Sequence, residues 1–250
     1  MCTVTWHFSA ESGGWALDLG FNRDERRSRP RARAPRLIRP DEGLPFIAPQ
    51  DPVGGGTWLA LNAAGLCLGL LNLYAQDEPQ PAVQPTLSRG QLVWRLAVLP
   101  DAESLRAGLR SILEGERLQP FDLLLLKGGG ARLARRLRWD GRALSEADLL
   151  QGPPLISSSA HEPSEVIAGR LAQHVALTAG VPLGPEEMAA FHRSHRPERG
   201  PRSVCMHRSD ARTVSYSQLR AGSDDLSFRY AAGAPCRAKL GPPLRLARQA

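Results

Sequence analysis

Residues 2–25, CTVTWHFSAESGGWALDLGFNRDE, decide the fold expected for this chain. Apolar and polar side chains alternate over residues 2–8 and again over 15–21, which is the period of a half-buried β-strand. Between the two runs, residues 10–14 (AESGG) have the composition of a turn. The stretch therefore predicts a β-hairpin.

The register of this hairpin returns a charged cluster to the start of the chain. With the turn centred near Ser12, the numbers of opposed residues sum to about 24. Cys2 is then expected opposite Asn22, give or take about two residues. Residues 22–25 (NRDE) are thus expected beside the first thiol of the chain.

Cys2 has the features of a self-activating nucleophile once Met1 is removed, which a small second residue permits. One residue would then carry both a thiol and a free α-amino group. The pKa of an α-amino group is about 7.7–8 and that of a thiol about 8.5, so the amine can accept the thiol proton near neutral pH. A neighbouring Arg23 favours the thiolate, and Asp24 can orient the ammonium or the guanidinium.

The rest of the chain predicts hairpins, helices and strands in an order that fits a layered α+β domain. A second hairpin is expected over 57–62 and 66–74, and long loops are expected over 26–56 and 76–88. The predicted helices are 89–99, 101–115, 163–178 and 185–195. The predicted later strands are 121–127, 132–139, 204–207, 213–219 and 226–230. No internal repeat is present, and a single domain over 1–250 is expected.

Composition narrows the classes of function. Apolar residues make up 42% of the 250, and no apolar run approaches the ~18–20 residues of a membrane span. The first residues lack a charged region followed by an apolar stretch, so no secretory signal is expected. The net charge is +7, but lysine occurs only at Lys127 and Lys239, so 30 of the 32 basic residues are arginine. That skew is typical of GC-rich codon usage, and nucleic-acid binding is not expected.

The cysteine pattern favours a reducing, cytoplasmic location. The four cysteines are Cys2, Cys67, Cys205 and Cys236, and no two of them form a C-x-x-C pair. Neither a metal site nor a disulfide framework is indicated by these spacings, although four cysteines are enough for two bridges. We therefore expect no metal and no bound cofactor.

Two histidines one helical turn apart, His192 and His195, have a spacing that can suit a metal. Arginines surround them, so a solvated basic helix end is the favoured interpretation. The glycine runs 54–56 and 128–130 lack the strand and helix context of a nucleotide loop.

The trio Cys205-Met206-His207 resembles a soft ligand set for haem or copper. In a strand, Cys205 and His207 would share one face and Met206 would point the other way. Ordinary strand packing is therefore favoured over coordination by all three.

Further motifs occur in a characteristic order. They are Met1-Cys2, Asn22-Arg23-Asp24-Glu25, Ser28-Arg29-Pro30, Gly55-Gly56-Thr57-Trp58, Asn72 within Leu71-Asn72-Leu73-Tyr74, and Ser88-Arg89-Gly90. Weaker matches follow at Phe121-Asp122-Leu123-Leu124 and Arg202-Ser203. In these motifs the chain resembles the NRDE family, which includes the relatives of transport and Golgi organisation protein 2.

The resemblance implies a fold and a set of site residues. The family is similar to N-terminal-nucleophile hydrolases, which form a four-layer αββα sandwich and include bile salt hydrolases, penicillin V acylases and acid ceramidases. By that likeness Cys2 attacks an amide carbonyl, while Arg23 and Asp24 lie against its thiol and amine. Asn72 matches the asparagine that donates to the developing oxyanion.

The sequence departs from those hydrolases in two places. They have Arg-Asn-x-Asp where this chain has residues 22–24 (NRD), and serines at 157–159 replace a second expected asparagine. Arg202 is a candidate for a late active-site arginine. Eukaryotic members of the family are linked to haem trafficking and to lipid or acyl-CoA metabolism.

Two hypotheses of function follow. In the first, the protein is a cysteine hydrolase of a non-peptide acyl-amide bond in a small or lipidic substrate, with Cys2, Arg23, Asp24 and Asn72 as its catalytic residues. In the second, the same scaffold carries haem or an acyl chain without catalysis, and haem would be its only cofactor. A scaffold with vestigial chemistry is a third possibility.

Overall fold

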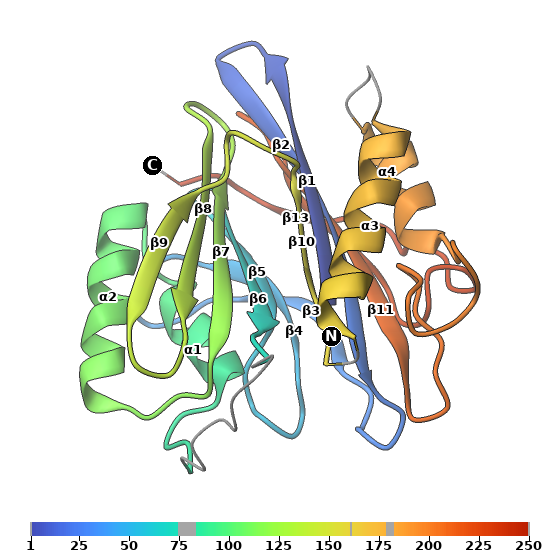
Figure 1. The fold of residues 1–250 in the computed structure, drawn as a ribbon. Helices are drawn as coiled ribbons and strands as arrows, with labels where there is room; N and C mark the ends of the chain where they lie inside the picture. Colours follow the sequence, from blue (N-terminus) through green and yellow to red (C-terminus); the bar gives the residue numbers. More distant parts are fainter. Residues whose placement is uncertain (1, 75–83, 161, 179–182, 250) are drawn as a thin grey trace.

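The protein forms a four-layer sandwich in which two β-sheets face each other and helices cover both outer faces (Figure 1). The computed structural model describes residues 2–74, 84–160, 162–178 and 183–249. This is the expected α+β architecture of αββα type. The predicted loop 76–88 lies largely outside the described residues.

The first sheet is built around the predicted hairpin. In spatial order its strands are β10 (Leu155–Ser158), β1 (Cys2–Glu11), β2 (Gly14–Arg26), β11 (Ala211–Ala221), β12 (Leu226–Ala231) and β13 (Leu244–Leu246). Cys2 lies opposite Arg23, one position beyond Asn22 and within the expected range. Since side chains on a strand alternate between faces, this shift places Cys2 and Arg23 on the same face of the sheet.

The second sheet contains the second predicted hairpin. Its strands, in both spatial and chain order, are β3 (Arg33–Ile38), β4 (Phe46–Gln50), β5 (Leu59–Asn62), β6 (Leu66–Asn72), β7 (Phe121–Lys127), β8 (Leu133–Trp139) and β9 (Leu144–Asp148). All neighbouring strands in it are antiparallel.

The prediction of one long loop over residues 26–56 was wrong, because this segment contains β3 and β4. Residues 46–48 are an apolar run of only three residues, too short to stand out among prolines and arginines, yet they are buried, and Phe46 and Ile47 pair with β5. Both arginines of β3, Arg33 and Arg36, are exposed at the sheet edge, where charge discourages further strand pairing.

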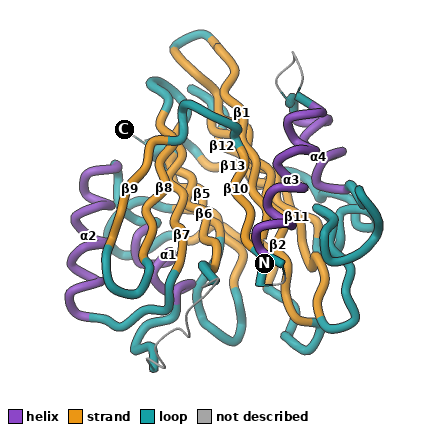
Figure 2. The backbone as a smooth tube through the Cα atoms, in the orientation of Figure 1, coloured by secondary structure: helices purple, strands orange, loops and turns teal. Residues whose placement is uncertain are grey.

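Helices cover the sheets in pairs. Helices α1 (Arg89–Leu96) and α2 (Ala102–Gly115) lie on the seven-stranded sheet, while α3 (Pro163–Leu177) and α4 (Pro185–Arg193) lie on the six-stranded sheet (Figure 2). The Ser88 hydroxyl caps α1 in a capping box with Gln91, and the Asp101 carboxylate caps α2. No helix among the described residues is long and apolar enough to cross a membrane.

The core lies between the sheets. One face of the hairpin contributes Val4, Trp6 and Phe21, which are buried in one cluster with residues of β6 and β7. The ring of Phe21 lies over Gly69 of β6, where a Cβ atom would be 3.5 Å from the ring. The two sheets are therefore in direct contact at this point.

The segment 204–207, predicted to be a strand, is irregular. Its residues Val204, Cys205 and Met206 are buried, which explains the apolar pattern. The Cys205 N–H donates to the Ser194 carbonyl and the Met206 N–H to the Thr213 hydroxyl. The segment meets β11 at isolated points, where the Thr213 N–H donates to the Met206 carbonyl and His207 forms a single bridge with Arg212, so no continuous strand forms. Strands β9, β10 and β13 were not predicted.

Candidate active site

The four residues expected from the sequence line one cavity. Cys2, Arg23, Asp24 and Asn72 surround a cavity of ≈ 410 Å³ at the end of the sandwich where β1 and β2 meet β6. The residues come from both sheets, and they are up to 70 positions apart in the chain. The fold therefore assembles the set that the sequence motifs indicate.

Cys2 is held between two neighbouring strands. It pairs with Ser158 of β10 on one side and with Arg23 of β2 on the other. The Cys2 N–H donates to the Ser158 hydroxyl at 3.1 Å, and the Ser157 hydroxyl donates to the Cys2 carbonyl at 3.2 Å. The serines that replace an expected asparagine thus fix the backbone of the candidate nucleophile.

Burial is the main influence on the Cys2 thiol, and it raises the pKa of that thiol above its ordinary value. The negative charge of Asp24 acts in the same direction. A hydrogen bond from the Asp24 backbone N–H and the positive charge of Arg23 act in the opposite direction and favour the thiolate.

Arg23 is a fixed cation on the same side of the sheet as the thiol. Its guanidinium lies 4.3 Å from the centre of the Trp58 ring, a cation–π contact. It also forms ion pairs with Glu25 at 3.1 Å and Asp51 at 3.6 Å, and Arg29 binds the same two carboxylates. The Arg23 side chain is consequently buried and held in one orientation.

Asp24 points to the opposite face of β2 from Arg23 and is buried there. Its Oδ1 accepts a hydrogen bond of 2.6 Å from the Thr213 hydroxyl. Its Oδ2 has no hydrogen-bond donor and lies 3.9 Å from the Arg170 guanidinium. Burial raises the pKa of this carboxyl, while the charge of Arg170 opposes that rise.

Arg170 is the residue that sequence reasoning missed. Its side chain is 1% exposed, and it donates to the Thr3 hydroxyl at 2.7 Å, the Ser157 hydroxyl at 3.0 Å and the Ser203 carbonyl at 2.7 Å. A signal was present, because Val166, Arg170 and His174 recur every four residues and form the buried stripe of α3.

Arg202, the candidate for a late arginine, lies elsewhere. Its side chain is 46% exposed and pairs with Glu162 at 2.9 Å and Glu165 at 2.7 Å. The buried arginine next to Asp24 is Arg170, so that expectation was wrong for Arg202.

Asn72 ends β6 and faces the cavity. Its Nδ2 donates to the Tyr74 hydroxyl at 3.3 Å, and an amide nitrogen has a second N–H. Asn72 and Cys2 approach the cavity from different sheets. This arrangement suits a donor that meets an oxygen held above the thiol.

Two further motifs meet at the cavity rim. A Cβ atom on Gly56 would lie 2.0 Å from the Gly90 carbonyl carbon, so only glycine allows these backbones to touch. The Thr57 N–H donates to the Gly90 carbonyl at 3.0 Å, and the Ser88 hydroxyl donates to the Gly54 carbonyl at 3.1 Å. The contact brings Arg89 to the cavity, where burial lowers the pKa of its guanidinium.

His192 is not part of a solvated helix end, so that interpretation was wrong for this residue. Its imidazole is fully buried under α4, 2.9 Å from the Thr5 hydroxyl, and Gly20 beneath it leaves room for the ring. Burial lowers the pKa of His192 to about 3. His195 points elsewhere, toward Cys205, His207 and Cys236.

Solved structures of three amide hydrolases share this fold. Penicillin V acylase from Agrobacterium tumefaciens is 12% identical over 92% of this chain and 83% of its own, with a TM-score of 0.53. The Caenorhabditis elegans ortholog of N-acylethanolamine-hydrolyzing acid amidase is 8% identical, over 88% and 92%, with a TM-score of 0.58. A variant of conjugated bile acid hydrolase from Clostridium perfringens is 11% identical, over 99% and 97%, with a TM-score of 0.52.

These likenesses show a fold of the N-terminal-nucleophile hydrolase type. No curated protein sequence matches this chain. The model of the Transport and Golgi organisation 2 family matches residues 1–138, which are more than half of the chain and include every motif that lines the cavity. The protein therefore belongs to the Transport and Golgi organisation 2 family.

Proposed function

We propose that this protein is a cysteine hydrolase that cleaves a non-peptide acyl-amide bond, with Cys2 as its nucleophile after removal of Met1. One observation carries the proposal. Cys2, Arg23, Asp24 and Asn72 line a single cavity, although they come from two sheets and only two of them are adjacent in sequence.

The chemistry begins at Cys2. Its free α-amine takes the thiol proton, and the thiolate attacks the substrate carbonyl carbon. The Asn72 amide donates a hydrogen bond to the oxygen as it gains negative charge. The ammonium then returns the proton to the leaving nitrogen, which departs as an amine and leaves a thioester on Cys2. Water activated by the same amine hydrolyses the thioester, releasing the acid and regenerating the thiol.

Arg23 acts on the thiol of Cys2, and Asp24 acts on its α-amine. The guanidinium of Arg23 favours the thiolate, against the burial that raises the pKa of the thiol. Asp24 Oδ2 lacks a donor in the present arrangement, and an ammonium on Cys2 would supply one. Arg170 is a positioning residue in this scheme, because it holds Asp24, Thr3 and Ser157 without lining the cavity.

The cavity favours a substrate with polar groups near the scissile bond. Among the described residues its lining is mostly charged or polar, with Trp58 and Leu70 as the main apolar contributions. Arg89 suits a carboxylate or another anion on the substrate, whereas Arg29 is already paired with Glu25 and Asp51. The haem or acyl-chain carrier stays a prediction.

The test begins with the intact mass of untagged protein, which is expected to lack Met1. N-acyl amides with varied acyl and amine parts are then screened for release of the amine. Cys2→Ala is expected to lower the rate at least about 10³-fold while the chain stays folded. Cys67→Ala is the matched control, because Cys67 is a buried thiol of β6 that does not line the cavity. Retention of Met1, or full activity in Cys2→Ala, would refute the proposal.

A further inference from the structure

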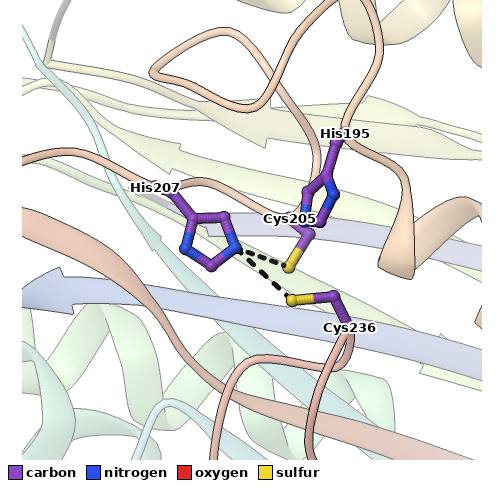
Figure 3. A group of neighbouring side chains, drawn as sticks. All are labelled: His195, Cys205, His207 and Cys236. Carbon is purple, nitrogen blue, oxygen red and sulfur yellow. Dashed lines mark hydrogen bonds between the residues drawn. The ribbon is translucent and has the colours of Figure 1, made fainter.

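A second group of reactive side chains lies outside the cavity of Cys2. His195, Cys205, His207 and Cys236 converge from three segments, which follow α4, precede β11 and follow β12 (Figure 3). One ligand atom from each residue lies within 4.8 Å of the others. The four residues span 42 positions of the chain, so only the fold brings them together.

The distances match those of a small metal ion. His207 Nε2 lies 3.6 Å from the Cys205 sulfur and 3.5 Å from the Cys236 sulfur. Zinc bonds of about 2.0–2.1 Å to nitrogen and about 2.3 Å to sulfur separate tetrahedral ligand atoms by roughly 3.3–3.8 Å. The group therefore needs only small side-chain shifts to surround an ion.

One ligand atom has no other use in the structure. The Nε2 atom of His195 is buried and has no hydrogen-bond partner. The His195 and His207 rings meet edge to face, with centroids 5.1 Å apart, so His195 also points into the group. A buried nitrogen without a partner costs free energy, and a metal ion would remove that cost.

The surrounding charges determine which ligand set is stable. Arg199 and Arg237 act on the His207 ring electrostatically. The positive charges of these arginines disfavour a metal site that itself carries a net positive charge. Two thiolates and two neutral imidazoles around a doubly charged ion have no net charge, which satisfies this condition.

We propose that His195, Cys205, His207 and Cys236 bind one Zn²⁺ ion in a closed tetrahedral site. Binding releases the two thiol protons to solvent, and each sulfur then bonds to the metal as a thiolate. Because all four positions are taken by side chains, the ion has no open position for water or substrate. The site is structural.

The site supports the cavity of Cys2 through the backbone between its ligands. The Met206 N–H, between Cys205 and His207, donates to the Thr213 hydroxyl at 2.8 Å, and that hydroxyl donates to Asp24. Zinc would therefore stiffen the segment that holds Asp24. The zinc site itself does not depend on whether the cavity is catalytic.

The test is metal analysis of the folded protein after reduction and removal of metal. Native mass spectrometry with added Zn²⁺ is expected to show one ion per chain and the loss of two protons. Co²⁺ is expected to give the absorption bands of a tetrahedral ion with thiolate charge transfer. Cys236→Ala is expected to lose both signals, and the matched control Cys67→Ala is expected to keep them.

Thermal unfolding supplies a readout that does not need a variant. The midpoint of the reduced wild-type protein is expected to rise with Zn²⁺ and to fall again with a chelator. Absence of zinc binding by the folded, reduced wild type would overturn the proposal. So would a protein whose native form is two hydrogens lighter through a Cys205–Cys236 disulfide, because that bond uses both sulfur ligands.

Discussion

The two faces of the β1–β2 hairpin are both covered, but by different kinds of residue. The face toward the other sheet buries apolar side chains: Val4, Trp6, Leu17, Leu19 and Phe21. The face under α3 and α4 buries polar ones: Thr3, Thr5, Asn22 and Asp24. Alternation along a strand assigns residues to faces, yet it does not reveal that a polar face is also buried.

The difference lies in what each face needs from its neighbours. Apolar side chains need only close packing, so one apolar side chain can replace another of similar volume. Buried polar atoms need specific hydrogen-bond partners, and Arg170 of α3 and His192 of α4 supply them. The helix-facing side should therefore be the more sensitive to single substitutions that preserve volume.

Replacement of Arg170 by methionine is expected to have the largest effect. It leaves Asp24, Thr3 and Ser157 without their shared cation and donor, and loss of one partner of a buried charge pair costs about 3–5 kcal/mol. Urea unfolding measures the change. Arg202→Met is the control, and loss of its solvent-screened ion pairs should change stability far less. Equal losses in both variants would mean that the polar face is not specially sensitive.

Acidification is expected to destabilise the polar face through His192. Its folded-state pKa of about 3 lies below its unfolded value near 6.5, so between these values the unfolded chain binds more protons. Stability is then lost as the pH falls from about 6.5 toward 3, by about 1.4 kcal/mol per pH unit for this one group. Buried His174 and Arg170 face the same ring and reinforce the shift.

The measurement compares unfolding free energies of the wild type and His192→Gln at pH 6 and pH 4. The variant cannot titrate at this position, so its loss should be smaller by roughly 2–3 kcal/mol over these two pH units. His7→Gln is the control on a half-buried ring, where a smaller change is expected. An unchanged pH dependence in His192→Gln would contradict the assignment of this histidine as buried and neutral.

A smaller effect is expected for Thr213→Val. The Thr213 hydroxyl donates to Asp24 and accepts from the Met206 N–H, and valine of similar shape can do neither. Two buried polar groups lose a partner, so unfolding should become easier by about 2 kcal/mol. Thr178→Val, at the end of α3, should change stability by less than about 0.5 kcal/mol. Calorimetry of both variants checks this. A near-zero change in unfolding free energy for Thr213→Val would mean that the hydroxyl does not stabilise Asp24 and Met206.

The sequence was sufficient to predict structure where the signals were local or formed a series of ordered motifs. The hairpin of residues 2–25 fixed the position of Cys2 to within one residue, and the motif order indicated Asn72 as part of the same cavity. The fold class was predicted from the same motifs, through their resemblance to the NRDE family. These features depend on strand alternation, turn composition and short motifs that follow one another in a characteristic order.

The sequence was insufficient where a contact depended on which helix face meets the sheet. Arg170 has a helical spacing that predicts burial, but its partners Thr3 and Ser157 come from two other strands. The same holds for His195 and Cys236, which are 41 residues apart in irregular segments without periodicity. Such contacts are fixed by tertiary packing alone.

The pairing of Cys2 with Ser158 and Arg23 has a consequence for how the protein is produced. Cys2 lies inside a sheet and at the cavity, and any peptide added before it would convert its amine to an amide. The last described residues lie at the opposite end of the sandwich, where the Gln249 N–H donates to the Ala63 carbonyl (Figure 1). An affinity tag belongs at that end, since a tag before Cys2 would leave no free α-amine for the proposed mechanism.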